Sequence, residues 1–182
     1  MCLKYNVAIR GVILNKVQPD KVGMLWDYFP KALKRWNVPL IGVVPDLPTL
    51  AYPSMMDFEQ LFEAELLSGS SRRFMQYKQK SLVTSGLRRF LVKLSSNAYN
   101  ETLFVTHASR NDIILGFLSH SQNYEQKTGK MFGGGLILTG NPPDDIPQPH
   151  IMEIITGSAS PVLYASSTTY KAMDRITNYT GM

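Results

Sequence analysis

The stretch GVILNKV at residues 11–17 is the part of this sequence that decides the fold. Its apolar residues run into a polar end, and one helix length later PLIGVVPD at residues 39–46 repeats the pattern, with an apolar run that stops at a proline. Two such runs joined by a helix predict a parallel crossover unit, because parallel strands need a long connection. Ligands of parallel α/β sheets bind at the carboxyl ends of the strands, so the residues at these ends are the first binding candidates.

The rest of the sequence predicts a second α/β part. In the first part we expect strands over 7–14 and 40–44 and helices over 22–36 and 54–67. The flexible stretch SGSS at residues 68–71 then favours a boundary between two domains, residues 1–67 and 68–182. Beyond it the patterns predict strands over 80–84, 102–106, 136–139 and 162–165, and helices over 87–94, 112–120, 151–155 and 170–178. The polar residues 121–130 and the proline-rich residues 142–149 are expected to be exposed loops.

Composition excludes several classes of protein. The chain has 182 residues, 44% of them hydrophobic, which is enough for a buried core. The 19 basic and 14 acidic residues give a net charge of +5, but the basic residues are scattered, which favours solvated surfaces over nucleic-acid binding. Cys2 is the single cysteine, so an internal disulfide or cysteine-based zinc cluster is excluded and a reducing compartment fits. No bilayer-length apolar run or signal peptide is recognisable, so we expect a soluble cytoplasmic protein without a membrane partner.

Three further segments carry a resemblance to a known family: THASRNDIIL at residues 106–115, GLILTG at 135–140 and TTY at 168–170. Together with GVILNKV and IGVVP, in this order and spacing, they resemble the N-terminal region of long-form phosphate acetyltransferase. In that region a P-loop domain similar to dethiobiotin synthetase and cobyrinic acid a,c-diamide synthase precedes a DRTGG domain. The resemblance implies an α/β fold made of the C-terminal strands of a P-loop NTPase-like parallel sheet followed by a small DRTGG-type α/β domain.

The chain departs from the family pattern where charge matters. Ser109 and Thr168 stand where the family motifs have Asp, and Asn141 stands where the Thr-Gly-Gly strand has its second Gly. Loss of two carboxylates argues against a metal held at these positions. No Gly-x-x-x-x-Gly-Lys-Ser/Thr phosphate loop occurs in the sequence, so we expect neither ATP hydrolysis nor a bound cofactor.

In the first part, the resemblance assigns Asn15 to the edge of a purine and makes Pro45 a wall of the base pocket. The alternative is that Asn15 is a turn residue that caps the following loop, and that Pro45 only ends its strand. Without a phosphate loop we favour the turn role.

In the second part, the predicted site residues follow consecutive strands or open their helices, so we expect them at one sheet edge. They are Thr106, His107, Ser109, Arg110, Thr139, Gly140 and Thr169. Arg110 at a helix start would complete an anion site, or it would pair with Asp112 or Asp144 on the surface. His107 is a possible general base, but no nucleophile with an orienting acid is recognisable around it. Hydroxyl and amide groups suit a neutral or anionic ligand better than a metal.

Two hypotheses for the function follow. The first is a non-catalytic regulatory or ligand-binding module for an anionic small molecule or nucleotide, acting through an enzyme partner or as a homo-oligomer. The second is a piece of an enzyme, either a phosphate acetyltransferase or an ATP-dependent amide-forming synthetase, whose catalytic parts lie elsewhere. A Gly-rich phosphate loop encoded upstream of Met1 would favour the second hypothesis.

Overall fold

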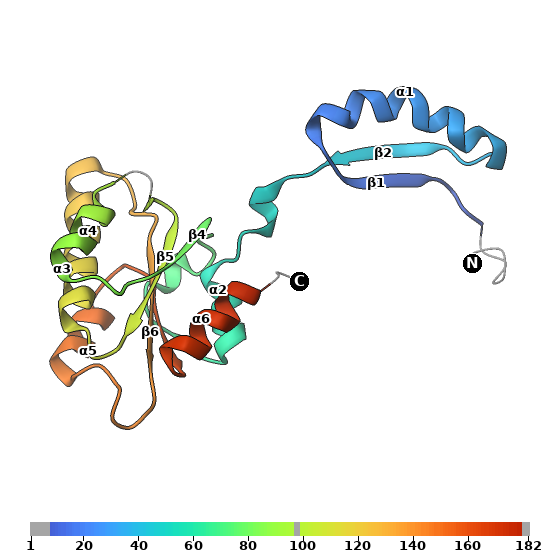
Figure 1. The fold of residues 1–182 in the computed structure, drawn as a ribbon. Helices are drawn as coiled ribbons and strands as arrows, with labels where there is room; N and C mark the ends of the chain where they lie inside the picture. The colour runs from blue at the N-terminus through green and yellow to red at the C-terminus, as the bar shows by residue number, and fades with distance from the viewer. Residues whose placement is uncertain (1–7, 97–98, 180–182) are drawn as a thin grey trace. The chain divides into compact units, whose positions relative to one another are not determined.

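The chain divides into two compact units, Met1–Leu50 and Ala51–Met182, in a computed structural model that describes residues 8–96 and 99–179 (Figure 1). The division lies before the boundary expected at residues 67 and 68. Residues 51–67 belong to the second unit, because Met55 and Phe58 are fully buried in one of its cores. The two units are described separately below.

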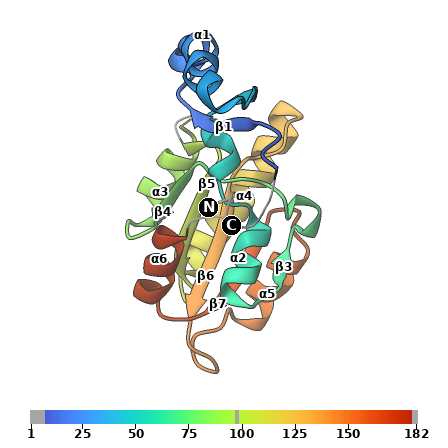
Figure 2. The same cartoon turned by 90° about the vertical axis from the view of Figure 1, so that its right-hand side faces the viewer.

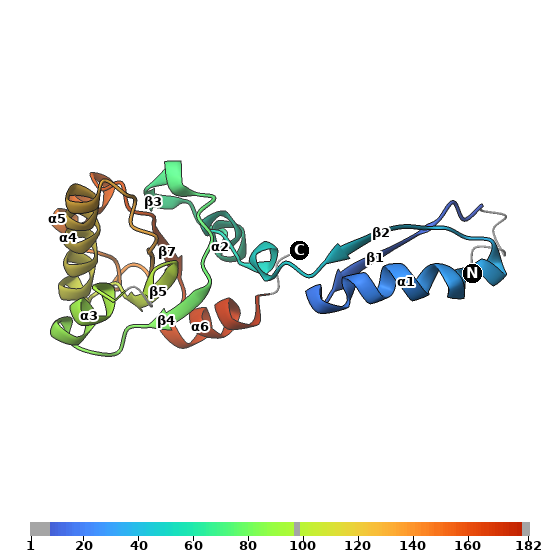
Figure 3. The same cartoon turned by 90° about the horizontal axis from the view of Figure 1, so that it is seen from above.

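The first unit is the parallel crossover expected from its sequence. Strands β1 (Val12–Val17) and β2 (Leu40–Pro45) pair in parallel, and helix α1 (Val22–Leu33) connects them and lies along the sheet (Figure 3). Short 3-10 turns flank the helix, η2 (Pro19–Lys21) and η3 (Lys34–Trp36). The strand predicted over residues 7–14 begins only at Val12 and continues to Val17, and residues 1–7 lie outside the described part of the chain.

The first unit leaves its apolar residues largely uncovered. The half-buried residues Val22, Leu25 and Phe29 recur on one face of α1, as the helical spacing predicts. Ile13 and Ile41 are 60% and 57% exposed, and none of residues 8–50 is buried. Two strands and one helix therefore do not enclose a core.

The second unit contains a five-stranded sheet of order β3-β7-β6-β5-β4. The four expected strands are present and mutually parallel: β4 (Gln79–Leu82), β5 (Thr102–His107), β6 (Gly135–Gly140) and β7 (Val162–Ser166). The sequence did not predict β3 (Leu66–Ser68), which pairs antiparallel with β7. Leu66 and Leu67 were assigned to a helix over 54–67, but α2 (Met55–Phe62) ends earlier, at its C-cap Glu63, which adopts a left-handed conformation with φ 52°.

Helices cover both faces of this sheet (Figures 1 and 2). Helices α3 (Leu87–Leu94), α4 (Asn111–Thr128) and α5 (Pro149–Thr156) lie on one face, and α2 and α6 (Thr169–Asn178) lie on the other. Successive strand residues point to opposite faces. Phe104 therefore packs between Phe90 and Phe117 on the α3 and α4 side, whereas Leu103 belongs to the core under α2 and α6.

The start of α2 carries a capping box formed by Ser54 and Asp57. The Asp57 backbone N–H donates to the Ser54 Oγ at 3.4 Å, and the Ser54 N–H donates to the Asp57 carboxylate at 2.6 Å. Burial would raise the pKa of Asp57, but the hydrogen bonds from Ser54 and from the Tyr179 hydroxyl hold it below its ordinary value. This carboxylate therefore stabilises the helix start in its charged form.

Helix α4 is longer than the sequence indicates. Residues 121–128, expected in an exposed loop, continue the helix to Thr128. The reason lies in tertiary pairing: Arg72 binds the Glu125 carboxylate with two hydrogen bonds of 2.6 and 2.9 Å, and the Phe132 N–H donates to the same carboxylate. Polar residues that look like a loop in the sequence are thus the outer face of a helix.

Candidate functional site

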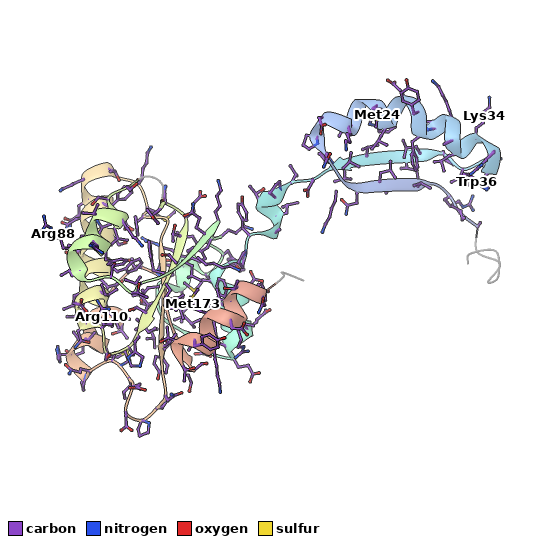
Figure 4. The ribbon with its side chains drawn as sticks, viewed as in Figure 1. Met24, Lys34, Trp36, Arg88, Arg110 and Met173 are labelled. Carbon is purple, nitrogen blue, oxygen red and sulfur yellow. The ribbon has the colours of Figure 1, made fainter. Side chains whose placement is uncertain are left out.

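The carboxyl ends of β5, β6 and β7 meet at one edge of the second sheet. His107 lies opposite Thr139 in the β5–β6 register, and Gly140 lies opposite Ser166 in the β6–β7 register. Helix α4 starts just after β5, with Arg110 at its N-cap, and α6 starts just after β7 (Figure 4). The seven site residues predicted in the second part therefore share one edge.

Thr139 and Thr169 form the centre of this edge on the α6 side. The Thr139 hydroxyl donates to the Thr106 carbonyl at 3.2 Å and lies 2.7 Å from the Thr169 hydroxyl. Since Thr139 has one proton to donate, Thr169 is the donor between the two hydroxyls. Thr168, where the family has Asp, caps α6 by accepting from the Lys171 N–H at 3.4 Å. Thr168, which stands in place of the family's Asp, therefore serves as the N-cap of α6.

His107 lies between Ser109 and Asp145. Its Nδ1 is 2.8 Å from the Ser109 Oγ and also accepts from the Ser109 N–H at 3.3 Å. Because this N–H can only donate, Nδ1 is an acceptor and the ring proton lies on Nε2, which is 3.7 Å from the Asp145 carboxylate. Neither the serine partner of His107 nor the acid beside it is recognisable in the sequence.

A nucleophile, a base and an acid are suggested by the arrangement of Ser109, His107 and Asp145. The backbone N–H groups that follow His107, however, are hydrogen-bonded within a turn. The Ser109 N–H donates to His107 Nδ1, the Arg110 N–H to the His107 carbonyl, and the Asn111 N–H to the Ser109 carbonyl. Acyl transfer needs donors aimed at the developing oxyanion. These three amides already have partners, so the arrangement suits hydrogen-bond recognition of a ligand better than nucleophilic attack.

Gly140 is what lets Asp145 reach this edge. A Cβ at Gly140 would lie 2.5 Å from the Cβ of Asp145 and closer still to its carbonyl oxygen. The loop also closes through the Asp145 N–H to the Asn141 carbonyl at 3.1 Å and the Tyr164 hydroxyl to the Asp145 carbonyl at 2.9 Å. The glycine therefore permits a close approach of two backbones.

Arg110 forms a surface ion pair, which is one of the two roles considered for it. Its guanidinium makes two bonds of 2.9 Å to Asp112 and one of 3.1 Å to the Ser85 carbonyl. The bond from Arg110 holds the pKa of Asp112 below its ordinary value, so the pair is charged. Asp112, not Asp144, is the acidic partner, and an anion at this edge would have to compete with it. Anion binding by Arg110 stays a prediction.

Three buried oxygen atoms near the same edge have no hydrogen-bond partner among the described residues. They are the Thr106 Oγ1, the Ser85 Oγ and the Asn111 Oδ1. Thr106 points to the face opposite Thr139, because its side chain follows Phe104 on the α4 side. Buried polar atoms are normally paired, so these atoms retain capacity for a further hydrogen bond.

The two candidates in the first unit lie at the carboxyl ends of their own strands. Val17 pairs with Pro45, and the Asn15 Oδ1 accepts from the Lys16 N–H at 2.9 Å, where Lys16 is left-handed with φ 55°. Asn15 thus lies within β1, at an irregularity before the last residue of the strand, and not in a loop that follows it. Purine recognition by Asn15 and Pro45 stays a prediction.

In the helix layer of the second unit, one hollow lies between α3 and α4 and another between α4 and α5. Neither is recognisable in the sequence, because such grooves depend on how helices pack.

Within residues 8–96 and 99–179, no group of three or more His, Cys, Asp and Glu side chains is placed to hold a metal ion. No helix in that part of the chain is both long enough and apolar enough to cross a bilayer.

Comparison with known proteins agrees with the resemblance in the second unit. The family model of the DRTGG domain matches residues 59–179. The chain is also similar to the crystal structure of the CBS and DRTGG domains of the regulatory region of Clostridium perfringens pyrophosphatase, complexed with its activator, diadenosine tetraphosphate. That similarity has a TM-score of 0.49 and 13% identity, and covers 92% of this chain and 72% of the other.

Proposed function

The chain belongs to the DRTGG domain family, and from that premise we propose that it is a non-catalytic regulatory module that binds a small anionic molecule or nucleotide. The observation that carries the proposal is the convergence at one sheet edge of polar groups from four separate segments. We call His107, Ser109, Thr139, Asp145 and Thr169 the sheet-edge cluster. Ligands of parallel α/β sheets occupy this position.

The groups at this edge favour hydrogen-bonded recognition. Ser109 and Thr169 are hydroxyl groups beside the starts of α4 and α6, where backbone amides favour negative charge. Arg110 contributes a positive charge near this edge, and Asp112 and Asp145 contribute negative charges. An anionic ligand would gain from the helix starts and from Arg110 once it displaced Asp112.

Calorimetric titration with AMP and inorganic phosphate tests the proposal. We expect Arg110→Ala to weaken binding by about 1.5–3 kcal/mol, the range for a hydrogen bond to a charged group. Arg88→Ala is the matched control, since Arg88 is an exposed arginine of α3 that forms no ion pair with the described residues (Figure 4). Equal affinity in wild type and Arg110→Ala, or no anion binding at all, would leave Arg110 with a purely structural role.

We also propose that the first unit is a C-terminal part of a P-loop NTPase-like sheet, as in the N-terminal region of long-form phosphate acetyltransferase. Its parallel β1-α1-β2 crossover and the exposure of Ile13, Ile41 and Trp26 support this reading. Such a surface needs further strands or another subunit to cover it.

Native mass spectrometry of the purified chain tests whether the first unit associates with another subunit. A homo-oligomer, or a stable complex with a P-loop-containing enzyme, is the expected result. A monomer that stays monodisperse at high concentration would contradict self-association. The alternative, a piece of a phosphate acetyltransferase or amide-forming synthetase, rests on the same crossover and would be favoured by a phosphate loop encoded upstream.

A further inference from the structure

We propose that the groove between α3 and α4 is a second binding site, separate from the sheet-edge cluster, for a flat heteroaromatic ligand that carries a negatively charged group. An adenine mononucleotide has this chemistry. The groove, here called the α3/α4 groove, is lined by Leu91, Leu94, Gly116, His120, Tyr124 and Lys127, among others. The inference does not depend on ligand binding at the sheet edge.

The groove has the size and lining of a small-molecule site. Gly116 lets α4 lie close to α3, since a Cβ there would be 2.6 Å from the Leu87 Cδ1. From this contact the hollow extends along α4 to Thr128, with a volume of about 540 Å³. Small-molecule sites measure roughly 300–1,000 Å³ and combine apolar walls with a few polar groups.

Aromatic rings form one wall of the groove. The His120 and Phe132 rings are 5.2 Å apart at 75°, and the Tyr124 and Phe132 rings are 5.6 Å apart at 62°. Leu91 and Leu94 of α3 lie among the residues of the opposite side. A flat ring fits between an aromatic wall and an aliphatic one, because both offer close contact over its faces.

His120 supplies a hydrogen-bond acceptor that nothing in the described chain uses. Its Nε2 is buried and has no partner among the described residues. Burial lowers the pKa of His120, a backbone hydrogen bond to Leu94 opposes this, and the charge of Lys127 lowers it further, so the ring is neutral near pH 7. A neutral imidazole that donates one N–H to a carbonyl keeps a lone pair on the other nitrogen. A ligand that reaches this nitrogen should present an N–H or O–H donor, as an exocyclic amino group does.

Lys127 supplies the positive charge. It is exposed, lines the groove and makes no ion pair with the described residues. Its charge lowers the pKa of His120, which also lines the groove. A phosphate or carboxylate on the ligand would therefore have a counter-ion at the rim.

The hollow between α4 and α5 lacks these features, although its volume is about 640 Å³. The Ser160 hydroxyl donates to the Ser121 hydroxyl at 2.7 Å, and Glu125 is paired with Arg72. Its buried polar groups are thus already used in holding the fold together. An unpaired buried acceptor distinguishes the α3/α4 groove.

Calorimetry on the full chain with AMP, adenosine and inorganic phosphate tests the site. We expect AMP to bind and Lys127→Ala to weaken AMP about tenfold, with little change for adenosine, because only AMP carries the charge. Lys130→Ala is the matched control, since Lys130 is exposed beyond the end of α4 and outside the groove. Asn123→Trp, which places a large ring at an exposed lining position, should abolish adenosine binding in the groove and the binding of AMP at that site.

Histidine NMR separates this site from the sheet edge. The chain has three histidines, so the ring signals of His120 and His107 are readily assigned by substitution. AMP should shift the His120 signals, and Arg110→Ala should leave that shift unchanged. The inference is wrong if AMP does not bind, if AMP shifts the His120 signals of Asn123→Trp as it does those of wild type, or if only the His107 signals move. It would also be overturned if inorganic phosphate alone shifted the His120 signals as AMP does.

Discussion

Replacing Gly140 with alanine tests how the sheet-edge cluster is assembled. The added Cβ would lie 2.5 Å from the Asp145 Cβ and closer still to the Asp145 carbonyl oxygen, where ordinary contacts begin at 3.4 Å, so the loop has to move by at least 0.9 Å. That movement strains the 2.9 Å bond from the Tyr164 hydroxyl to the Asp145 carbonyl. Overpacking costs about 1–3 kcal/mol, and a lost hydrogen bond costs about 1 kcal/mol. We therefore expect the free energy of unfolding of the second unit to fall by about 2–4 kcal/mol.

Urea unfolding followed by far-UV circular dichroism measures this change. Both tryptophans, Trp26 and Trp36, lie in the first unit, so tryptophan fluorescence reports on that unit and should not change. Gly157→Ala is the matched control, because Gly157 has φ −76° and the nearest atom to its added Cβ is 3.4 Å away. It should be neutral or stabilising by up to about 1 kcal/mol. If Gly140→Ala unfolds like wild type and like Gly157→Ala, the close approach of Asp145 is not what this position requires.

Three more outcomes are expected. The pKa of Asp57 is lower in the folded chain than its ordinary value of 3.8, so its contribution is present above that pH and is lost as pH falls through the lower folded value. The difference in urea midpoint between wild type and Asp57→Asn should therefore shrink in acid; a difference that does not depend on pH would refute this. Arg72→Ala should destabilise the second unit by about 3 kcal/mol in the same assay, because it leaves Glu125 without its bidentate partner; a loss under 1 kcal/mol would contradict it. Residues 51–182 should fold alone and residues 1–50 should not, as seen by circular dichroism of each piece; a cooperatively unfolding 1–50 fragment would count against the division into units.

The sequence was sufficient for the order of elements because short-range periodicity determines whether a segment buries one face. The alternating runs ending at His107 and Gly140 became neighbouring parallel strands, and Val22, Leu25 and Phe29 became one face of a helix. Where prediction was wrong, a distant partner was responsible. Ser68 entered a strand because β7 lies beside it, and its hydroxyl bonds to the Ser160 carbonyl at 2.7 Å.

The residues of the site also fall into two groups, those that the sequence places and those that only the tertiary structure places. That Thr106, Thr139 and Thr169 share one edge follows from the rule that parallel strands end together, and the sequence by itself was enough to place them. Only the tertiary structure decided that Arg110 pairs with Asp112 and that Asp145 lies beside His107. The physical reason is that a loop's path depends on contacts between residues far apart in the chain, which local periodicity does not encode. The α3/α4 groove belongs to this second class, because its volume exists only once two helices have packed against one sheet.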